Sequence, residues 1–308
     1  MVNQSETYHV PVLLEESVDA LNIKENGIYV DATYGGGGHS KKILDKLKTG
    51  KLFAFDRDTD AKANLPNDNR LIFIQNNFRF MRNFLKYHNI EKVDGILADL
   101  GVSSHHFDVA ERGFSFRFPE SDLDMRMGKD SEDTAKKIIN SYSHEKLRKM
   151  FFEYGEIKQA DKLSRAIIRE REIKPLDTIN DFVQSIASVI PKFDEKHFLA
   201  TVFQAIRIEV NKEMVSLKHF LEQTVQLLVP QGRLSVISYH SLEDRMVKNF
   251  MKTGNTYGEK HKDFYGNEIT PFKLITKKAI VPTEKELNLN SRSRSAKLRV
   301  AEKLKEIE

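Results

Sequence analysis

Cysteine is absent from the 308 residues of this chain. Its absence excludes disulfide bonds, thiolate metal sites and a cysteine nucleophile, and it fits a reducing compartment. The sequence also lacks any run of 18 apolar residues, and its first ten residues, MVNQSETYHV, have no apolar core behind a basic segment. We therefore expect a cytoplasmic protein without a membrane partner.

A large charge of one sign is missing too, because the net charge is only +4 and the pI is about 8.9. This mildly basic balance permits a polyanionic partner without requiring one. The residues present, 40% hydrophobic and 9% aromatic, are typical of a globular protein with a large core. A chain of this length predicts one domain with an insertion, or two domains.

Short apolar runs alternate with helical patterns over the first hundred residues, which predicts an α/β fold with a doubly wound sheet. The strands are expected at 27–33, 51–58, 70–77, 93–101, 227–241 and 295–302. Ligands bind at the carboxyl ends of the strands in such sheets. The polar residues expected on this functional edge are Asp31, Asp56, Asn76, Asn77 and Asp99.

From about Asp108 the pattern changes to helices rich in Lys, Glu and Arg, with Ser143 and Thr178 as expected N-caps. The expected organisation is a core at 1–107 and 206–308, with a helical substrate-recognition domain at 108–205 inserted between the two parts. Gln204, Arg207 and Asn211 recur at helical spacing. A solvated helix face is the default interpretation of these three residues, and a face reaching the active-site cleft is the alternative.

The stretch VDATYGGGGHS places four glycines between a predicted strand and a predicted helix. Such a loop lets a ligand approach the backbone amides and the positive end of the helix dipole. A P-loop would need Gly-Lys-Ser/Thr, but His39 and Ser40 follow the glycines, and Ser40 also stands where a dinucleotide fingerprint starting at Gly35 needs Gly or Ala. Both phosphate sites are therefore disfavoured, and a purely structural glycine turn is equally compatible with the pattern.

Two carboxylates extend this pattern. Asp56 ends the next strand, where an acid in Rossmann-like sheets binds both ribose hydroxyls, although it also suits a helix N-cap. A glycine loop with a ribose acid and no pyrophosphate signature favours a nucleoside cofactor without phosphates, of which S-adenosylmethionine is the commonest. Asp99 then lies where the reactive end is expected. We expect Asp99 either to accept a hydrogen bond from an amine or to stabilise the sulfonium side of the cofactor, and helix capping is again its alternative role.

Other polar motifs are less specific. No metal site is expected at HHFD, because adjacent histidines point apart and no cysteine supports them. RGFSFRF, residues 112–118, interleaves Arg and Phe as single-stranded nucleic-acid surfaces do, or as a half-buried strand does. We predict phosphate contacts for Arg112, Arg292 and Arg294. His240 and Ser241 follow the fifth strand and are expected either to contact the target base or to cap the next helix.

A set of longer motifs resembles one family, the bacterial 16S ribosomal RNA cytosine-N4 methyltransferases of the RsmH/MraW type. The motifs run in order from His9 to Lys303: HVPVLLEE, DATYGGGGHS, AFDRD, DGILADLGVSS, ERGFSF, LDMRM, FQAIRIEVN, GRLSVISYHSLEDR and RSRSAKLRVAEK. The resemblance implies a class I (Rossmann-like) methyltransferase sheet with an inserted helical domain. It also implies S-adenosyl-L-methionine as cofactor and, as substrate, a cytidine of the decoding region in 16S ribosomal RNA of the small subunit.

The resemblance also implies roles for individual residues. Gly37, Gly38 and His39 would line the methionine moiety, Asp56 would hold the ribose, Phe78 would contact the adenine, and Asp99 would lie beside the transferred methyl group. The family usually has Pro-Gln where this chain has His105 and His106. Histidine can still donate a hydrogen bond, so His106 is retained as a cofactor-binding residue.

Three other functions remain open at this point. A nicotinamide-dependent oxidoreductase is opposed by the missing third glycine, and an inactive RNA-binding assembly factor is opposed by the intact glycine loop, Asp56 and Asp99. Methylation of a protein or DNA amine is the runner-up for the substrate. The sequence leaves the oligomeric state undetermined, with a homodimer among the alternatives.

Overall fold

The computed structural model describes residues 11–102, 107–128 and 132–305, and the chain forms two compact units. Unit 1 comprises Met1–Gly101 and Met214–Glu308, and unit 2 comprises Val102–Glu213. The boundary expected between residues 205 and 206 falls inside helix α9 (Glu195–Asn211), because this helix packs along its whole length in the core of unit 2.

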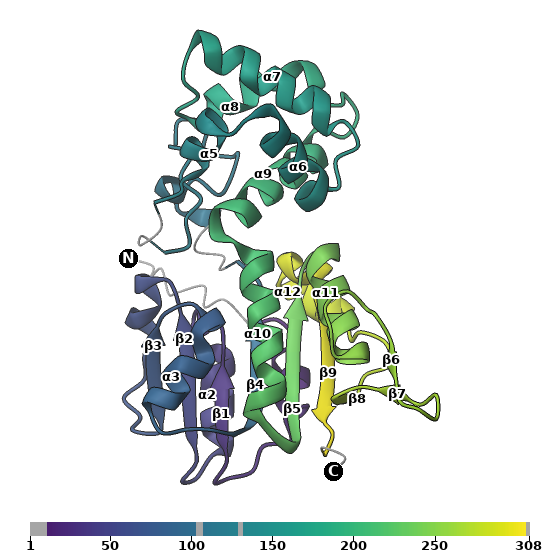
Figure 1. Cartoon of the computed structure of the whole chain (residues 1–308). Helices are drawn as coiled ribbons and strands as arrows, with labels where there is room; N and C mark the ends of the chain where they lie inside the picture. Colours follow the sequence, from purple (N-terminus) through teal and green to yellow (C-terminus); the bar gives the residue numbers. More distant parts are fainter. Residues whose placement is uncertain (1–10, 103–106, 129–131, 306–308) are drawn as a thin grey trace, which may run out of the picture. The chain divides into compact units, whose positions relative to one another are not determined.

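Unit 1 is built on a seven-stranded sheet with the order β3-β2-β1-β4-β5-β9-β8 (Figure 1). The first five strands are parallel, and β9 is antiparallel to both of its neighbours. This arrangement confirms the Rossmann-like sheet. The strands are β1 (Ile28–Asp31), β2 (Lys51–Asp56), β3 (Leu71–Gln75), β4 (Val93–Asp99), β5 (Leu228–Ser238), β8 (Phe272–Leu274) and β9 (Lys297–Lys303).

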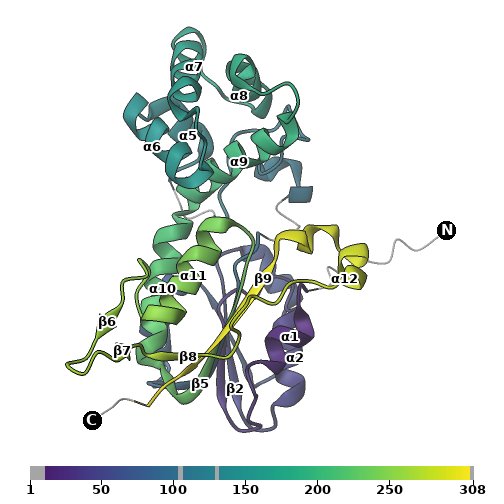
Figure 2. The same ribbon diagram turned by 90° about the vertical axis from the view of Figure 1, so that its right-hand side faces the viewer.

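Helices cover both faces of the sheet, as Figure 2 shows. Alternation along the strands explains this, since Val30 packs against one set of helices and its neighbour Tyr29 against the other. One layer contains α1 (Leu14–Asp19) and α2 (Gly38–Lys46), and the other contains α3 (Met81–Tyr87), α10 (Glu213–Leu227) and α11 (Ser241–Thr253). Unit 1 also has α12 (Glu284–Leu289) and three short 3₁₀ helices, η1 (Thr59–Asn64), η2 (Phe78–Phe80) and η5 (Ser291–Ser295).

Unit 2 is helical and has its own apolar core. Ser143 and Thr178 cap their helices as predicted, and Thr178 forms a capping box with Asp181. The helices are α5 (Ala135–Ser141), α6 (His144–Gly155), α7 (Ala160–Ile173), α8 (Ile179–Ser185) and α9, with the 3₁₀ helices η3 (Ala110–Arg112) and η4 (Ala187–Val189). None of the helices in the described parts of either unit combines the length and the hydrophobicity that a transmembrane span requires.

Two parts of the fold differ from the expectation. The segment 112–118 forms no strand, because Gly113 has a positive φ of 69° and turns follow it. Its aromatic rings serve unit 2 instead: Phe114 is buried and Phe116 packs edge-on against Phe203. Three short strands were not predicted: β6 (His261–Lys262), β7 (Glu268–Ile269) and β8. Strands of two or three residues are too short to show the alternation of apolar and polar residues that predicts a strand.

Candidate active site

The carboxyl ends of the parallel strands bring the predicted site residues of unit 1 to one edge of the sheet. The strand order places them side by side: Phe78 after β3, Asp56 at the end of β2, Asp31 at the end of β1, and Asp99 at the end of β4. The order reverses between β1 and β4, which is the position where doubly wound sheets bind their ligands. From β3 to β4 this row spans three interstrand spacings, roughly 14 Å, and therefore suits an elongated ligand.

Glycine occupies the four positions of the loop after β1 for different structural reasons. Gly35 and Gly37 have φ angles of 53° and 78°, which side chains disfavour. A Cβ on Gly38 would lie 2.1 Å from Cγ of Pro11. Gly36 is exposed, and a Cβ built there would meet no atom of the protein within 4 Å. The fold itself therefore explains three of the glycines, and Gly36 is the position open to a ligand.

Helix α2 begins at this loop with Gly37 as its N-cap. No side chain caps its first turn, and that turn contains no acidic residue. The first backbone N–H groups of a helix lack intrahelical partners and carry the positive end of the dipole. The start of α2 therefore favours a negatively charged group, such as the carboxylate of an amino acid.

Asp56 is tied to the glycine loop and is not a helix cap. Its Oδ2 accepts a hydrogen bond from Gly35 N at 2.7 Å, and its Oδ1 accepts one from Asp58 N at 2.8 Å. The 3₁₀ helix η1 is capped by Asp58 instead. The capping alternative for Asp56 is therefore wrong, and its carboxylate holds the loop and the end of β2 in one arrangement.

A buried carboxyl group lies beneath the loop. Asp31 is fully buried, its Oδ2 accepts a hydrogen bond from Ser40 Oγ at 2.7 Å, and its Oδ1 accepts one from Thr33 N at 3.0 Å. Burial raises the pKa of Asp31, while the nearby His39 and the Ser40 hydroxyl oppose this rise. His39 is itself buried, and its Nε2 lies 3.1 Å from the Val12 carbonyl oxygen, so this nitrogen donates. His39 therefore contributes to the support beneath the loop.

Asp99 is positioned from two sides. Its backbone N–H donates to Thr33 Oγ1 at 2.7 Å, which links the ends of β1 and β4. The hydroxyl group of Tyr239, just after β5, donates a hydrogen bond to the Asp99 side chain. Burial, the charge of Asp99 and this hydrogen bond raise the pKa of Tyr239 far above its usual range, so the phenol stays protonated and remains a donor. A Cβ on Gly101 would lie 2.7 Å from the Tyr239 ring, so glycine is needed there.

Phe78 opens the 3₁₀ helix η2, which is capped by Asn77. Its half-buried ring packs edge-on against Phe220, with the ring centroids 5.2 Å apart. Its adenine contact stays a prediction. His105 and His106 lie outside the described residues, so the prediction for His106 likewise stays a prediction.

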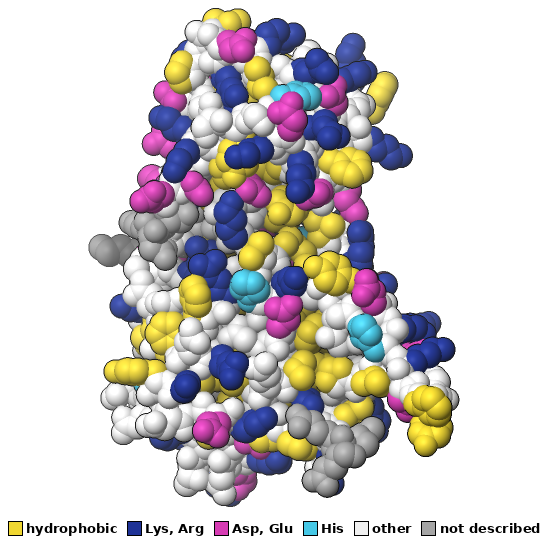
Figure 3. All heavy atoms as spheres, viewed as in Figure 1, with side chains coloured by type: hydrophobic (Ala, Val, Ile, Leu, Met, Phe, Trp, Pro, Cys, Tyr) yellow, Lys and Arg dark blue, Asp and Glu magenta, His cyan; other side chains and the backbone are white. Residues whose placement is uncertain are grey.

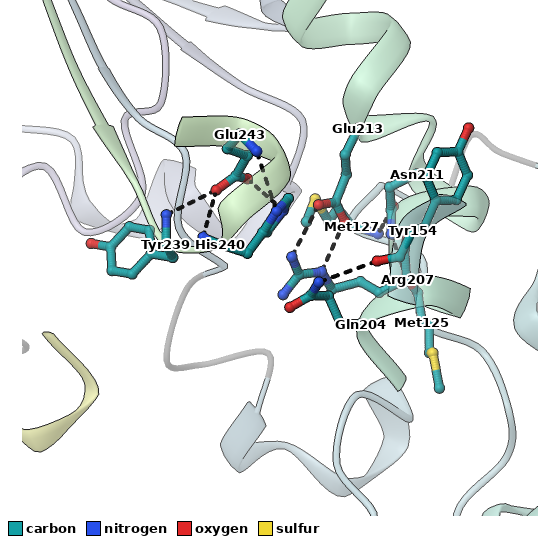
Figure 4. Close-up of polar contacts among 10 residues, drawn as sticks. All are labelled: Met125, Met127, Tyr154, Gln204, Arg207, Asn211, Glu213, Tyr239, His240 and Glu243. Carbon is teal, nitrogen blue, oxygen red and sulfur yellow. Dashed lines mark hydrogen bonds and ion pairs between the residues drawn. The ribbon is translucent and has the colours of Figure 1, made fainter. Parts of the chain in front are cut away.

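His240 caps the helix that follows β5, as Figure 4 shows. Its Nδ1 accepts a hydrogen bond from Glu243 N at 3.4 Å, and the Glu243 carboxylate accepts one from Tyr239 N at 2.9 Å. Ser241 is the first residue of α11. The structure thus supports the capping alternative for His240, and the same capping box fixes the backbone of Tyr239.

In unit 2, Gln204, Arg207 and Asn211 form an internal polar network, also drawn in Figure 4. Arg207 makes a bidentate ion pair with Glu213, at 2.9 and 3.0 Å. Asn211 is buried; its Oδ1 accepts from Met127 N and its Nδ2 donates to Met125 O, both at 2.8 Å. The expectation of a solvated face is therefore wrong, because Asn211 is buried against a loop of unit 2, Arg207 is paired with Glu213, and Gln204 Nε2 donates to Tyr154 O at 3.3 Å.

The arginines predicted to bind phosphate differ in their surroundings. The guanidinium of Arg112 donates to the carbonyl oxygens of Arg126 and Met127, at 3.2 and 2.9 Å. Arg112 therefore has a structural role within unit 2. Arg292 and Arg294 are exposed on η5 in unit 1.

Two residues at this edge of the sheet, Tyr239 and Ser40, were not predicted from the sequence. Tyr239 was passed over in favour of its neighbours His240 and Ser241, although β4 and β5 pair in the register Asp99↔Ile237. A residue two positions after Ile237 lies beside the end of β4, so strand order together with register would have indicated it. Ser40 was considered only as an obstacle to a phosphate-binding motif.

The sequence is similar to known proteins over nearly its whole length. The sequence profile of the MraW methylase family matches residues 6–304. The chain is 56% identical to the ribosomal RNA small subunit methyltransferase H of Phocaeicola vulgatus, over 98% of this chain and 100% of the relative. It is 54% identical to the protein of the same name from Flavobacterium johnsoniae, over 96% of this chain and 98% of the relative.

Among solved structures, an rRNA methylase from Streptococcus thermophilus covers 97% of this chain and 100% of its own, with 13% identity and a TM-score of 0.43. The family assignment does not depend on this structure. The profile match and the two full-length relatives suffice, and they confirm the resemblance seen in the motifs. The chain belongs to the MraW methylase family.

Proposed function

We propose that this protein is an S-adenosylmethionine-dependent methyltransferase that modifies the exocyclic N4 amine of a cytidine in 16S ribosomal RNA. The observation that carries the proposal is the position of Asp99, which lies at the switch point of the sheet between the glycine loop and Tyr239. Full-length relatives at 54% and 56% identity carry the name ribosomal RNA small subunit methyltransferase H. The decoding region and the cytoplasm are the expected place of action.

The residues at the sheet edge fit this cofactor. The uncapped start of α2 suits the carboxylate of the methionine moiety, and Gly36 leaves the room that a side chain would fill. Gly37, Gly38 and His39 are assigned to this end, Asp56 to the ribose and Phe78 to the adenine. The aspartates at the strand ends suit a cationic ligand better than the pyrophosphate of a nicotinamide cofactor. His106 remains assigned to the cofactor from the motif alone.

Positioning is the main task of the protein in this reaction. The bound cofactor supplies a methyl group on a sulfonium, an excellent leaving group, whereas the cytosine amine is a poor nucleophile because its lone pair is delocalised into the ring. Holding the amine in line can therefore provide much of the rate enhancement. Asp99 accepts a hydrogen bond from the amine and receives the proton that the nitrogen loses on methylation. Tyr239 orients the Asp99 carboxylate.

The two units have separate tasks in this proposal. Unit 1 holds the cofactor, and the helical unit 2 recognises the substrate. Arg292 and Arg294 of η5 contribute phosphate contacts, and Arg112 no longer belongs to this group because it supports a loop of unit 2. Reversing the charges of Arg292 and Arg294 is expected to weaken RNA binding and lower its salt dependence. Unchanged binding would remove them from the site.

Methyl transfer from labelled S-adenosylmethionine tests the proposal directly. The substrate is small ribosomal subunits from a strain lacking this protein, and the product is digested to nucleosides. Label in N4-methylcytidine is the expected result. Label in another nucleoside would contradict the position of methylation. If the protein binds the cofactor but no label is transferred, the proposed substrate is wrong and a role in assembly is favoured. A parallel reaction with naked 16S ribosomal RNA shows whether the assembled subunit is required.

A further inference from the structure

A small β-hairpin of unit 1 has no role in the site described above. It consists of β6 and β7, pairs in the register Lys262↔Glu268, and forms a sheet of its own. Figures 1 and 2 show it extending away from the helices and the main sheet of unit 1 between α11 and β8. Its strands bury nothing, since all four strand residues are exposed. Core packing therefore does not explain the hairpin.

Two adjacent aromatic residues occupy its tip. Phe264 is 97% exposed and Tyr265 is 86% exposed, and their rings pack in a T-shaped, edge-to-face pair with centroids 5.6 Å apart. Single exposed apolar side chains are common on protein surfaces. Two neighbouring aromatic rings that are almost fully exposed form a surface suited to a flat, apolar partner such as a nucleobase.

The turn that presents these rings is ordered by its own hydrogen bonds. The Asp263 carboxylate accepts from Tyr265 N at 2.9 Å, from Asn267 N at 2.8 Å and from Asn267 Nδ2 at 3.0 Å. These hydrogen bonds lower the pKa of Asp263. Gly266 supplies the positive φ of 86° that the turn requires. The rings are thus presented on a defined turn, which reduces the entropy lost on binding.

The segment that contains the hairpin carries a net positive charge. Residues 252–278 contain six lysines and three acidic residues. Two of these acids are engaged within the hairpin, because Glu268 pairs with Lys260 and Asp263 holds the turn. Lys262 and Lys273 are exposed, and Figure 3 shows dark blue side chains beside the yellow tip. Aromatic rings flanked by lysines match the bases and phosphates of single-stranded RNA.

We propose that the β6–β7 hairpin is an RNA-binding element, in which Phe264 and Tyr265 stack on unpaired bases and the neighbouring lysines contact phosphates. The inference rests on the proposed function, because the RNA it addresses is a segment of the ribosomal RNA substrate outside the methylated nucleotide. The hairpin touches no reacting group. It therefore contributes to substrate affinity and not to the chemical step.

A fluorescence experiment tests stacking directly, since the chain contains no tryptophan. Phe264→Trp places a single indole at the tip, and Tyr87→Trp places one at a residue of α3 that is 81% exposed, as a matched control. Addition of a short single-stranded RNA oligonucleotide is expected to quench the indole at 264 but not the one at 87. Equal quenching at both positions, or none at 264, would overturn the proposal.

Binding and kinetics of the full chain give a second, independent test. Removing both rings with Phe264→Ala/Tyr265→Ala is expected to weaken RNA binding about 10-fold or more, and to raise KM for the subunit with kcat unchanged. Lys262→Gln is expected to make the negative slope of log affinity against log salt less steep by about one. Unchanged KM and affinity in the double variant would refute the hairpin's role.

These outcomes are distinguishable from failure of the proposed function. If the wild-type protein methylates no RNA, the proposed function fails, while quenching at position 264 by the oligonucleotide still supports the hairpin. If the wild-type protein methylates subunits and the hairpin variants behave identically to it, only the hairpin proposal fails. Quenching by intact subunits but not by deproteinised ribosomal RNA would overturn RNA as the partner and indicate a ribosomal protein.

Discussion

At the scale of single residues, neighbouring glycines that look equivalent in the sequence are required for different physical reasons. Gly38 is required by the fold, since a Cβ would overlap Pro11, whereas a Cβ at Gly36 would meet nothing in the protein. Under the proposed function, the space beside Gly36 belongs to the cofactor. The two positions can therefore separate stability from binding.

We predict that Gly36→Ala folds with unchanged thermal stability but binds S-adenosylmethionine at least about 10-fold more weakly, because the added methyl group occupies ligand space. Gly38→Ala is the matched control and is expected to lose about 1–3 kcal/mol of unfolding free energy through overpacking against Pro11. Calorimetric titration and thermal unfolding measure the two effects. Normal cofactor affinity in Gly36→Ala would show that the ligand does not approach this residue.

Tyr239 illustrates a residue that acts through another. We predict that Asp99→Asn lowers kcat for methyl transfer about 10²-fold or more, and that Tyr239→Phe lowers it about 10-fold, since a hydrogen bond to a carboxylate is lost. The cofactor Kd is expected to change little in Tyr239→Phe.

The pH profile distinguishes this positioning role from a merely structural one. Without the Tyr239 hydroxyl, the Asp99 carboxylate loses a donor that favours its ionised form. The acid limb of kcat against pH is therefore expected to move to higher pH in Tyr239→Phe. An unchanged profile together with a weakened fold would assign Tyr239 to packing alone.

At the scale of elements, helix α8 shows how a cap couples stability to pH. Asp181 and Thr178 form the capping box, and Lys174 contacts Asp181 at 2.9 Å. The hydrogen bond from Lys174 and those from Thr178 lower the pKa of Asp181 from 3.8 to about 2. A lowered folded-state pKa contributes stability above the unfolded value, which is lost as the pH falls through the folded value.

We predict that Asp181→Asn lowers the unfolding free energy of unit 2 by about 1 kcal/mol at pH 7 and by little near pH 2. The value is smaller than the full pKa shift implies, because Lys174 is 70% exposed and water screens the pair. Urea unfolding of both proteins at several pH values measures the difference. A difference that does not shrink between pH 4 and 2 would show that the charge of Asp181 is not involved.

At the scale of the whole molecule, two separate cores imply two separable responses to ligand and mutation. The proposed cofactor residues that the structure describes all belong to unit 1, whereas the buried Asn211 belongs to unit 2 and satisfies backbone groups of Met125 and Met127. A ligand stabilises only what it binds, by about 2.7 kcal/mol at a concentration 100 times Kd.

We predict two transitions in calorimetric unfolding. S-adenosylmethionine is expected to raise the midpoint temperature of the transition of unit 1 only. Asn211→Ala is expected to lower the unfolding free energy of unit 2 by about 2–4 kcal/mol, because it leaves buried polar groups without partners. The cofactor Kd is expected to stay unchanged. Asn140→Ala, which removes bonds to Lys136 O and Leu176 O in the same unit, is a less buried comparison. A single transition that shifts with ligand would mean that the units unfold together.

The parallel sheet and the positions of Asp56 and Asp99 at strand ends could be predicted from the sequence, because apolar runs that stop at polar residues are a local pattern. Helix starts at Ser143 and Thr178 were equally local. The long motifs also sufficed to identify the family.

The contacts between side chains depend instead on how distant segments of the chain pack together. Tyr239 reaches Asp99 because β5 pairs with β4, and Arg112 binds the carbonyls of Arg126 and Met127 because the chain turns after Gly113. Asn211 is buried because a loop far away in the sequence folds against its helix. These contacts join residues that are distant along the chain, and no periodicity or local motif records such distances.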